Sequence, residues 1–213
     1  MIENISPKRV HSIPDFDGFH TFPPQKDKTI AVLGSSKSTK ALEEYEKASA
    51  DITRHFIENG YSVVHGCGTA GIMGSVYKSA AEASQKKNGI PYQNLAILKN
   101  PLWGDENLDE CKIIGQAKTE AERIEKFSRV SDRFLVFPGS TTTMQEATTL
   151  IQNNQYMPKN KEKKTIVLFG EKFWSGLIDQ YKKLFDSKLL KDNPIGNLFH
   201  IANTKEEVIK LLK

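Results

Sequence analysis

The sequence contains few cysteines and no apolar run of membrane-spanning length. Its only two cysteines, Cys67 and Cys111, are far apart in the sequence and belong to different predicted elements. A disulfide framework or a metal cluster is therefore not expected, and this cysteine usage favours a reducing cytoplasm. No stretch approaches the roughly 20 apolar residues of a membrane span, and the first residues lack a signal-peptide pattern. We predict a cytoplasmic protein that has no membrane partner.

Neither sign of charge is in large excess. The formal net charge is +4, from 30 Lys and Arg against 26 Asp and Glu. Much of the basic excess lies in residues 159–164 and near the termini, rather than in one long stripe. A solvated surface explains this pattern better than nucleic-acid binding. DNA binding is therefore ranked third among the candidate functions. A DNA-binding protein would show a steep salt dependence of binding.

The first 28 residues differ in composition from the rest of the chain. They place four prolines among three phenylalanines and show no helical period, which predicts an extended arm. Its aromatic side chains would pack on the domain surface or on another subunit. Residues 29–213 are long enough for one sizeable domain and short for two, so we predict a single domain there.

Strand and helix patterns alternate from residue 29 onward. Strands are predicted at residues 29–33, 61–65, 94–98, 111–114, 134–137, 165–169 and 199–201. Helices are predicted after residue 36 up to Asn59, at 71–85, at 119–130, after residue 140, at 173–190 and after residue 204. Residues 119–122 and 204–207 have capping-box spacing, which marks two of these helix starts. In the helix after residue 140, Met144, Ala147 and Ile151 lie on one side.

The strands at 29–33, 61–65 and 134–137 are apolar on both faces. This predicts the α/β class, with a doubly wound, mostly parallel sheet covered by helices on both sides. Ligands of such sheets bind outside the carboxyl ends of the strands, near a topological switch point. Glycine- or hydroxyl-rich turns follow three strands, at residues 34–36, 66–74 and 139–143. Three turns at one edge predict a ligand pocket, and the helix start after residue 140 is suited to an anion.

Two charged residues are candidates for chemistry at that edge. Arg123 lies near the start of the helix that precedes the 134–137 strand, so it should overhang the same crevice as Glu146. It would bind phosphate or hold Glu146 ionised; the alternative is an exposed helix arginine. For Glu146 the alternative is a capping box with Thr143, because the spacing of the two residues also fits that motif. Spacing alone leaves cap and catalysis equally open.

Four motifs together resemble the LOG family, cytokinin riboside 5′-monophosphate phosphoribohydrolases long labelled possible lysine decarboxylases. Residues 138–146 read Pro-Gly-Ser-Thr-Thr-Thr-Met-Gln-Glu, against the family pattern P-G-G-x-G-T-x-x-E. Glu122 and Arg123 start a Glu-Arg helix, which ends in Ser-Asp before the strand as in the family. Residues 66–74 match G-G-G-x-x-G-x-M-G, and residues 34–36 match G-S-S. The resemblance covers roughly residues 29–170.

The resemblance implies a Rossmann-like homodimer or higher homo-oligomer that hydrolyses the N-glycosidic bond of an adenosine monophosphate derivative. The products are a free base and ribose 5-phosphate, and no metal or redox cofactor is required. Arg123 and Glu146 are the implied catalytic pair. The implied substrate-binding residues lie in the three turns: Gly34, Ser35, Gly68, Thr69, Gly71, Met73, Gly139, Ser140, Thr141, Thr142 and Thr143.

The chain departs from the family pattern at four positions. Cys67, Ser140 and Thr142 replace glycines, and Ile124 replaces a lysine. Because glycine tolerates positive φ, we expect a steric cost at Ser140 and Thr142. The Ser140 and Thr142 hydroxyls can instead donate hydrogen bonds, which would alter the anion accepted.

These departures favour a second hypothesis, a non-catalytic carrier of a nucleotide or of the molybdenum cofactor on the same fold. Retention of Arg123 and Glu146 favours the hydrolase. Lysine decarboxylation is set aside, since no lysine lies in a recognisable pyridoxal-phosphate context. Two interpretations of Cys67 are open, a nucleophile or a small residue in a tight turn. The second is favoured, because no motif links a partner histidine to Cys67. His65 is interpreted as a core or turn histidine rather than a base.

Overall fold

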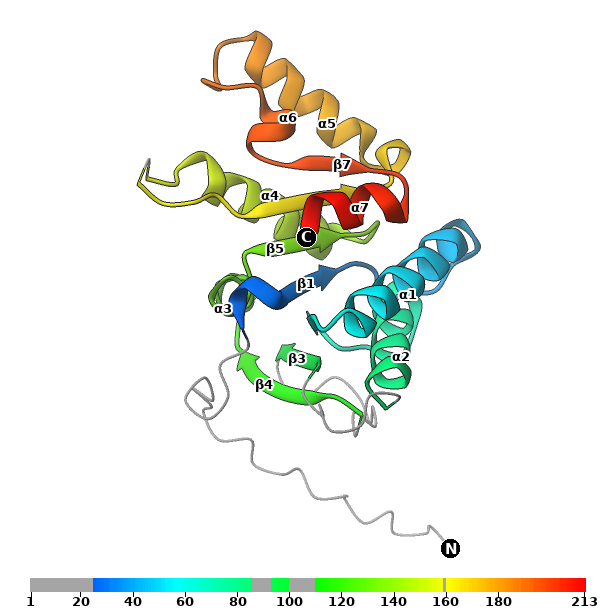
Figure 1. Cartoon of the computed structure of the whole chain (residues 1–213). Helices are drawn as coiled ribbons and strands as arrows, with labels where there is room; N and C mark the ends of the chain where they lie inside the picture. The colour runs from blue at the N-terminus through cyan, green and yellow to red at the C-terminus, as the bar shows by residue number, and fades with distance from the viewer. Residues whose placement is uncertain (1–24, 86–92, 100–109, 159) are drawn as a thin grey trace, which may run out of the picture.

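In the part of the chain that the structure describes, seven strands form one sheet (Figure 1). The structure is a computed structural model and describes residues 25–85, 93–99, 110–158 and 160–213. The strands are β1 (Thr29–Leu33), β2 (Ser62–His65), β3 (Asn94–Lys99), β4 (Lys112–Ala117), β5 (Arg133–Val136), β6 (Thr165–Phe169) and β7 (His200–Ala202). Their order in the sheet is β4-β3-β2-β1-β5-β6-β7, and every neighbouring pair is parallel. The predicted α/β class is confirmed.

Helices connect the strands and cover both faces of the sheet. They are α1 (Glu43–Glu58), α2 (Gly71–Gln85), α3 (Glu120–Val130), α4 (Thr141–Gln155), α5 (Glu171–Asp186), α6 (Pro194–Asn197) and α7 (Lys205–Leu212). Short 3-10 turns, η2 (Lys26–Lys28) and η3 (Lys40–Leu42), precede β1 and α1. One hydrophobic cluster joins α3, α4 and α5 to the sheet, and the other joins α1, α2 and α7 to it. The fold is therefore doubly wound.

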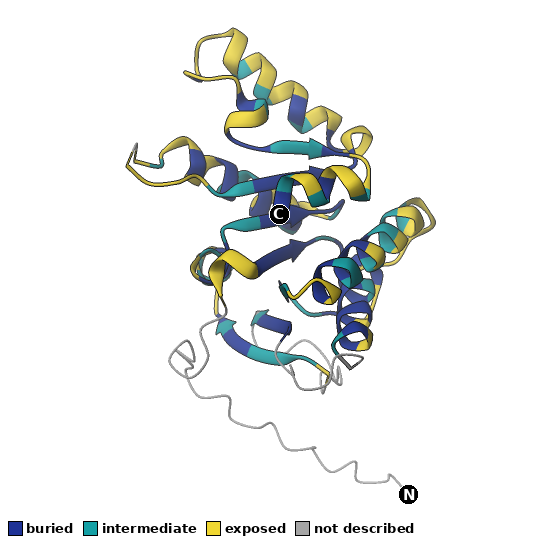
Figure 2. Ribbon diagram, in the orientation of Figure 1, coloured by how far each residue is buried: buried dark blue, intermediate teal, exposed yellow. Residues whose placement is uncertain are grey.

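The central strand β1 shows why both faces need helices. All five of its residues are buried. Ala31 and Leu33 belong to the cluster under α3, α4 and α5, whereas Ile30 and Val32 belong to the other one. This alternation follows from the pleat of a strand, whose successive side chains point to opposite faces. Figure 2 shows the central strands as buried and the outer helix surfaces as largely exposed.

Strand order places the topological switch between β1 and β5. The chain builds β2, β3 and β4 on one side of β1 and then returns to pair β5 with its other side. The carboxyl ends of β2, β1 and β5 are thus neighbours along one edge. The turns at residues 66–74, 34–36 and 139–143 follow those three strands, so the predicted convergence of the turns is confirmed.

Most predicted elements have bounds close to the observed ones, and two predictions need correction. The helix predicted over residues 173–190 ends at Asp186, and Lys188 beyond it has a φ of +59° that breaks the helical path. Within the predicted extended arm, Lys26–Lys28 form the turn η2. The remainder of the arm, residues 1–24, lies outside the described residues. In the described ranges, no helix combines the length and apolar character needed to cross a membrane.

The basic run before β6 is only partly solvated. Lys161 and Lys163 are exposed, as expected. Lys164 instead points inward, where its Nζ donates to the carbonyl oxygen of Ser128 at 2.9 Å and pairs with Asp132 at 2.8 Å. The cation therefore ties the end of α3 to the start of β6, and the solvated-surface interpretation is wrong at this residue.

Two glycines offer a matched test of backbone conformation. At both Gly60 and Gly176 a Cβ would meet open space, but Gly60 has a φ of +86° whereas Gly176 lies inside α5. We expect Gly60→Ala to lower the free energy of unfolding by about 1 kcal/mol. Gly176→Ala should raise it by about 0.5–1 kcal/mol, because alanine loses less backbone entropy in a helix. Urea denaturation measures both values, and changes of the same sign would contradict the assigned conformations.

Candidate functional site at the carboxyl edge of the sheet

Backbone hydrogen bonds join the three turns. The N–H of Ser35 donates to the carbonyl oxygen of Pro138 at 3.1 Å, and the carbonyl oxygen of Ser35 accepts from the N–H of Met73 at 3.0 Å. Gly34 lies so close to the other turns that a Cβ there would be 2.9 Å from Ile72 and 3.2 Å from Phe137. The first turn is thus clamped between the other two, and a side chain at residue 34 would separate them.

The middle turn holds the remaining glycine-rich residues of the predicted site. Gly68 and Gly71 have φ values of +138° and +62° and are buried. Thr69 is exposed between them, in a position to meet a ligand. The side chain of Met73 is 4% exposed and packs in the core cluster with α1. The ligand contacts predicted for these residues stay predictions.

Arg123 reaches the middle turn from the start of α3. A Cβ built on Gly66 would overlap the Arg123 Nη2 atom, so the guanidinium lies directly against the backbone of that glycine. The Arg123 side chain is 13% exposed, and its Cζ lies 5.6 Å from the centre of the Phe127 ring. The alternative of an exposed helix arginine is therefore wrong.

The structure adds Glu120, a carboxylate that the sequence reasoning missed. Its Oε2 lies 3.7 Å from Arg123 Nη1, and its side chain is 10% exposed. The signal that could have found it is the spacing, because residues three apart on a helix are neighbours. Glu120 and Arg123 together form a largely buried ion pair at the helix start. Buried charges need such pairing to offset desolvation.

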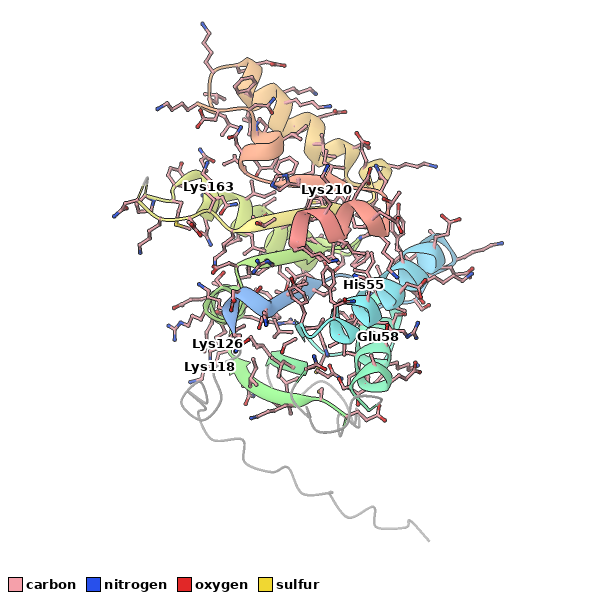
Figure 3. All side chains as sticks on the ribbon, viewed as in Figure 1. His55, Glu58, Lys118, Lys126, Lys163 and Lys210 are labelled. Carbon is pink, nitrogen blue, oxygen red and sulfur yellow. The ribbon has the colours of Figure 1, made fainter. Side chains whose placement is uncertain are left out.

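Helix α3 starts where the sequence predicts. Thr119 is the N-cap residue, and its Oγ1 accepts from the Glu122 N–H at 3.2 Å. The Glu122 carboxylate accepts from the N–H of Lys118 at 2.7 Å and pairs with Lys126 at 3.0 Å. Figure 3 shows Lys118 and Lys126 near each other at this end of the molecule. The Glu122 carboxylate therefore pairs with Lys126, whereas Glu120 pairs with Arg123.

Ile124 stands where the family pattern has a lysine, and its side chain packs in the core rather than at the candidate site. Ile124 is 2% exposed and packs in the core cluster with Phe127 and Val130. An isoleucine there adds to the core of α3 and brings no charge to the candidate site. The cationic group that α3 supplies to the turns is Arg123.

Glu146 lies in α4 and is 4% exposed. The helix begins at Thr141 with Ser140 as its N-cap residue, so Thr143 is already the third helical residue. A capping box between Thr143 and Glu146 is therefore wrong. The Thr143 side chain instead packs on Gly139, where an added Cβ would overlap its Oγ1. Helices α3 and α4 pack on the same face of the sheet, and the direct pairing of Arg123 with Glu146 stays a prediction.

The hydroxyl cluster presents a helix N-terminus to solvent. Ser140 and Thr141 are exposed, and Thr142 is half-buried. The first N–H groups of an α-helix have no intrahelical acceptor, so this end of the 15-residue α4 favours an anion. Met144 is 47% exposed, whereas Ala147 and Ile151 on the same side of α4 are buried.

The residues that replace family glycines differ in their backbone conformation. Ser140 has φ −82° and ψ −170°, and Thr142 is helical, so neither needs the conformational freedom of glycine. Cys67 has a φ of +64°, which disfavours any residue with a Cβ. The expected cost is therefore wrong for Ser140 and Thr142, and the strained replacement is Cys67.

His65 is a buried, hydrogen-bonded histidine, as interpreted from the sequence. Its Nε2 lies 2.7 Å from Asn94 Oδ1, and its Nδ1 accepts from the backbone N–H of Cys67 at 3.1 Å. Burial lowers the pKa of His65 to about 4; the charge of Arg123 acts in the same direction, and the bond to Asn94 opposes it. The ring is therefore neutral near pH 7 and supports the middle turn.

A parallel sheet with both faces covered and a topological switch between β1 and β5 defines a Rossmann-like α/β protein. The sequence profile of the family described as "Possible lysine decarboxylase" matches residues 73–212, and the chain belongs to this family. Curated relatives within it carry the LOG name, in agreement with the resemblance of the motifs.

Two such relatives align with most of the chain. The probable cytokinin riboside 5′-monophosphate phosphoribohydrolase LOG4 of Oryza sativa subsp. japonica is 24% identical over 186 residues, which are 87% of this chain and 76% of the relative. LOG5 of Arabidopsis thaliana, a cytokinin riboside 5′-monophosphate phosphoribohydrolase, is 25% identical over 184 residues, which are 86% and 77%.

A solved structure shares the fold. The molybdenum cofactor binding protein of Rippkaea orientalis superposes with a TM-score of 0.56 at 19% identity, over 86% of this chain and 94% of that one. At this level of identity the likeness concerns the fold alone.

The neutral state of His65 predicts a dependence of stability on pH. Between its ordinary pKa of 6.5 and the folded value of about 4, the unfolded histidine binds a proton that the folded one does not. The free energy of unfolding should therefore fall as the pH drops from 7 to 5, by about 2 kcal/mol from this residue. His65→Gln should show a shallower decline in urea denaturation at pH 7, 6 and 5. Equal declines in the two proteins would contradict this assignment.

Proposed function

We propose that the protein hydrolyses the N-glycosidic bond of an adenosine 5′-monophosphate, with or without an N6 substituent, to a free base and ribose 5-phosphate. The placement of Arg123 carries the proposal. Its side chain is largely buried, lies against Gly66 and belongs to a helix that starts at the ligand-binding edge of the sheet. Family membership supports the same class of reaction, because the curated relatives are named as phosphoribohydrolases.

In the proposed complex, the α4 N-terminus binds the 5′-phosphate. The backbone N–H groups after Gly139 point out of the helix start, and the positive end of the helix dipole favours the anion. The hydroxyls of Ser140 and Thr141 are exposed and able to donate to phosphate oxygens. Thr69, exposed on the middle turn, would border ribose and base.

The proposed chemistry uses the carboxylate of Glu146. Breaking the bond between ribose C1′ and the base nitrogen leaves the electron pair on the base and develops oxocarbenium charge on the sugar. A carboxylate beside that carbon stabilises the charge and orients the water whose oxygen bonds to C1′. The proton released by the water neutralises the departing base. Arg123 would hold the carboxylate ionised and ordered, and Glu120 would hold Arg123 in place.

The second candidate is a non-catalytic carrier of a nucleotide or of the molybdenum cofactor. The replacement of a turn glycine by Cys67 supports it, and the molybdenum cofactor binding protein of Rippkaea orientalis is an example of a cofactor-binding protein on this fold. A carrier would bind its ligand in the same crevice without releasing a base. The proposal also includes a homodimer or higher homo-oligomer and a cytoplasmic location.

Base release distinguishes the two candidates. We expect the protein to liberate base from AMP or N6-substituted AMP, followed by chromatography. Glu146→Gln and Arg123→Ala should each lower the rate by about 100-fold or more, the scale expected when a charge-stabilising group is lost. Glu125→Gln and Arg129→Ala are matched controls, because these two residues form an exposed ion pair on the same helix. Nucleotide binding without base release from any monophosphate would overturn the hydrolase and favour the carrier.

The contact between Gly66 and Arg123 gives a second prediction. In Gly66→Ala the new methyl group would overlap the Arg123 Nη2 atom, so the guanidinium must leave its position. We expect base release to fall by about 100-fold, as a displacement of about 1 Å can cause. Gly115→Ala is the control, since its nearest neighbour would be Lys126 at an ordinary 3.6 Å. Wild-type rates in a folded Gly66→Ala protein would show that Arg123 acts elsewhere.

A further inference from the structure

The two cysteines, 44 positions apart in the sequence, are in contact in the fold. Their Sγ atoms lie 3.8 Å apart, and both residues are half-buried. Cys67 belongs to the middle turn of the candidate site, and Cys111 directly precedes β4. The two cysteines are far apart in the sequence but adjacent in the fold, so the expectation that they are separated is wrong. We call Cys67 and Cys111 the thiol pair.

A chain of hydrogen bonds holds the two segments that carry the thiol pair. The Cys67 N–H donates to Nδ1 of His65, whose Nε2 lies 2.7 Å from Asn94 Oδ1. The Asn94 amide donates in turn to the carbonyl oxygen of Glu110 at 2.9 Å, and Glu110 is the neighbour of Cys111. His65 and Asn94 are buried, so water does not compete for these bonds. The two sulfurs are thus positioned by a fixed scaffold.

We propose that the thiol pair is a redox modification site, at which a low-molecular-weight disulfide such as oxidised glutathione converts Cys67 and Cys111 into an intramolecular disulfide. The Cys111 thiolate attacks one glutathione sulfur, and the other glutathione leaves as a thiolate. The Cys67 thiolate then attacks Cys111 Sγ, forms the new S–S bond and releases the second glutathione. Two cysteine thiols are oxidised, one glutathione disulfide is reduced to two glutathiones, and the thiol protons pass to the leaving thiolates.

The surroundings of Cys111 suit it to the first attack. The hydrogen bond with Cys67 lowers the pKa of Cys111, although burial opposes this effect. A lower pKa raises the thiolate fraction near neutral pH, and the thiolate is the nucleophile. A redox-active pair also fits a reducing compartment, where the rare protein disulfides are usually transient or sensory.

Oxidation would act on the candidate site through Cys67. An S–S bond of about 2.05 Å requires the two sulfurs to approach one another, and this movement pulls on the middle turn. Cys67 adjoins Gly66, against which the Arg123 guanidinium lies. We expect the oxidised protein to release base more slowly. This consequence rests on the proposed function, whereas formation of the disulfide does not.

The test uses the full chain, reduced and then incubated with excess oxidised glutathione. Intact mass, free-thiol titration and a non-reducing gel are measured with and without dithiothreitol. We expect the wild-type protein to lose both thiols and two hydrogen atoms, to stay a single chain, and to regain both thiols on reduction. Cys111→Ser and Cys67→Gly should instead each gain one glutathionyl group, which replaces the hydrogen of the remaining thiol. Glycine suits the φ of +64° at residue 67, so Cys67→Gly keeps the turn.

Three outcomes would overturn the proposal: two thiols that stay free, a wild-type protein that keeps glutathione in a mixed disulfide instead of closing the internal disulfide, or disulfide-linked dimers. The mass readout needs no substrate, so it fails or succeeds independently of the hydrolase. If the wild-type protein releases base, the rate of release should fall on oxidation and recover with dithiothreitol. If the protein forms the disulfide but releases no base under any condition, the redox site is supported and the proposed hydrolysis is contradicted.

Discussion

Parallel pairing of β1 with β2 on one side and with β5 on the other is the constraint on which the candidate site depends. Because the three strands run in one direction, the turns that follow them emerge at the same edge. The tight packing of Gly34 against Ile72 and Phe137 then holds the turns together, and the Ser35 backbone bonds to both neighbours. A ligand at this edge would meet three segments that are distant in the sequence.

The same topology decides where the charges lie. Helix α3 follows β4, so it starts at the ligand-binding edge and places Arg123 against the middle turn. The largely buried guanidinium needs a counter-charge, and Glu120 supplies one from the preceding helical turn. At the other side of the switch point, the N-terminus of α4 provides positive potential without a basic side chain. The carboxyl edge of the sheet thus combines an ion pair with a helix dipole, and the proposed phosphorylated substrate would meet both.

The replaced glycines show how local conformation sets the effect of a departure. Ser140 and Thr142 occupy ordinary backbone conformations, so their hydroxyls are added to the anion turn without strain. Cys67 occupies a left-handed conformation that disfavours its Cβ, yet it places a thiol 3.8 Å from Cys111. A strained residue beside a catalytic candidate is typical of functional positions. Here the strained residue is also the one with redox chemistry.

The sequence by itself determined the α/β class, the strand-and-helix order, the edge at which the turns meet, and Arg123 and Glu146 as candidates. These features depend on hydrophobic periodicity and turn composition, which are local. Tertiary structure alone decided the pairing of Glu120 with Arg123, the exposure of Met144, the burial of Lys164 and the contact between Cys67 and Cys111. Each depends on which elements become neighbours after the sheet forms, and residue spacing along the chain does not carry that information. The helix start at Thr141 falls between the two cases, because its sequence also fits a capping box at Thr143 and only the folded backbone selects between them.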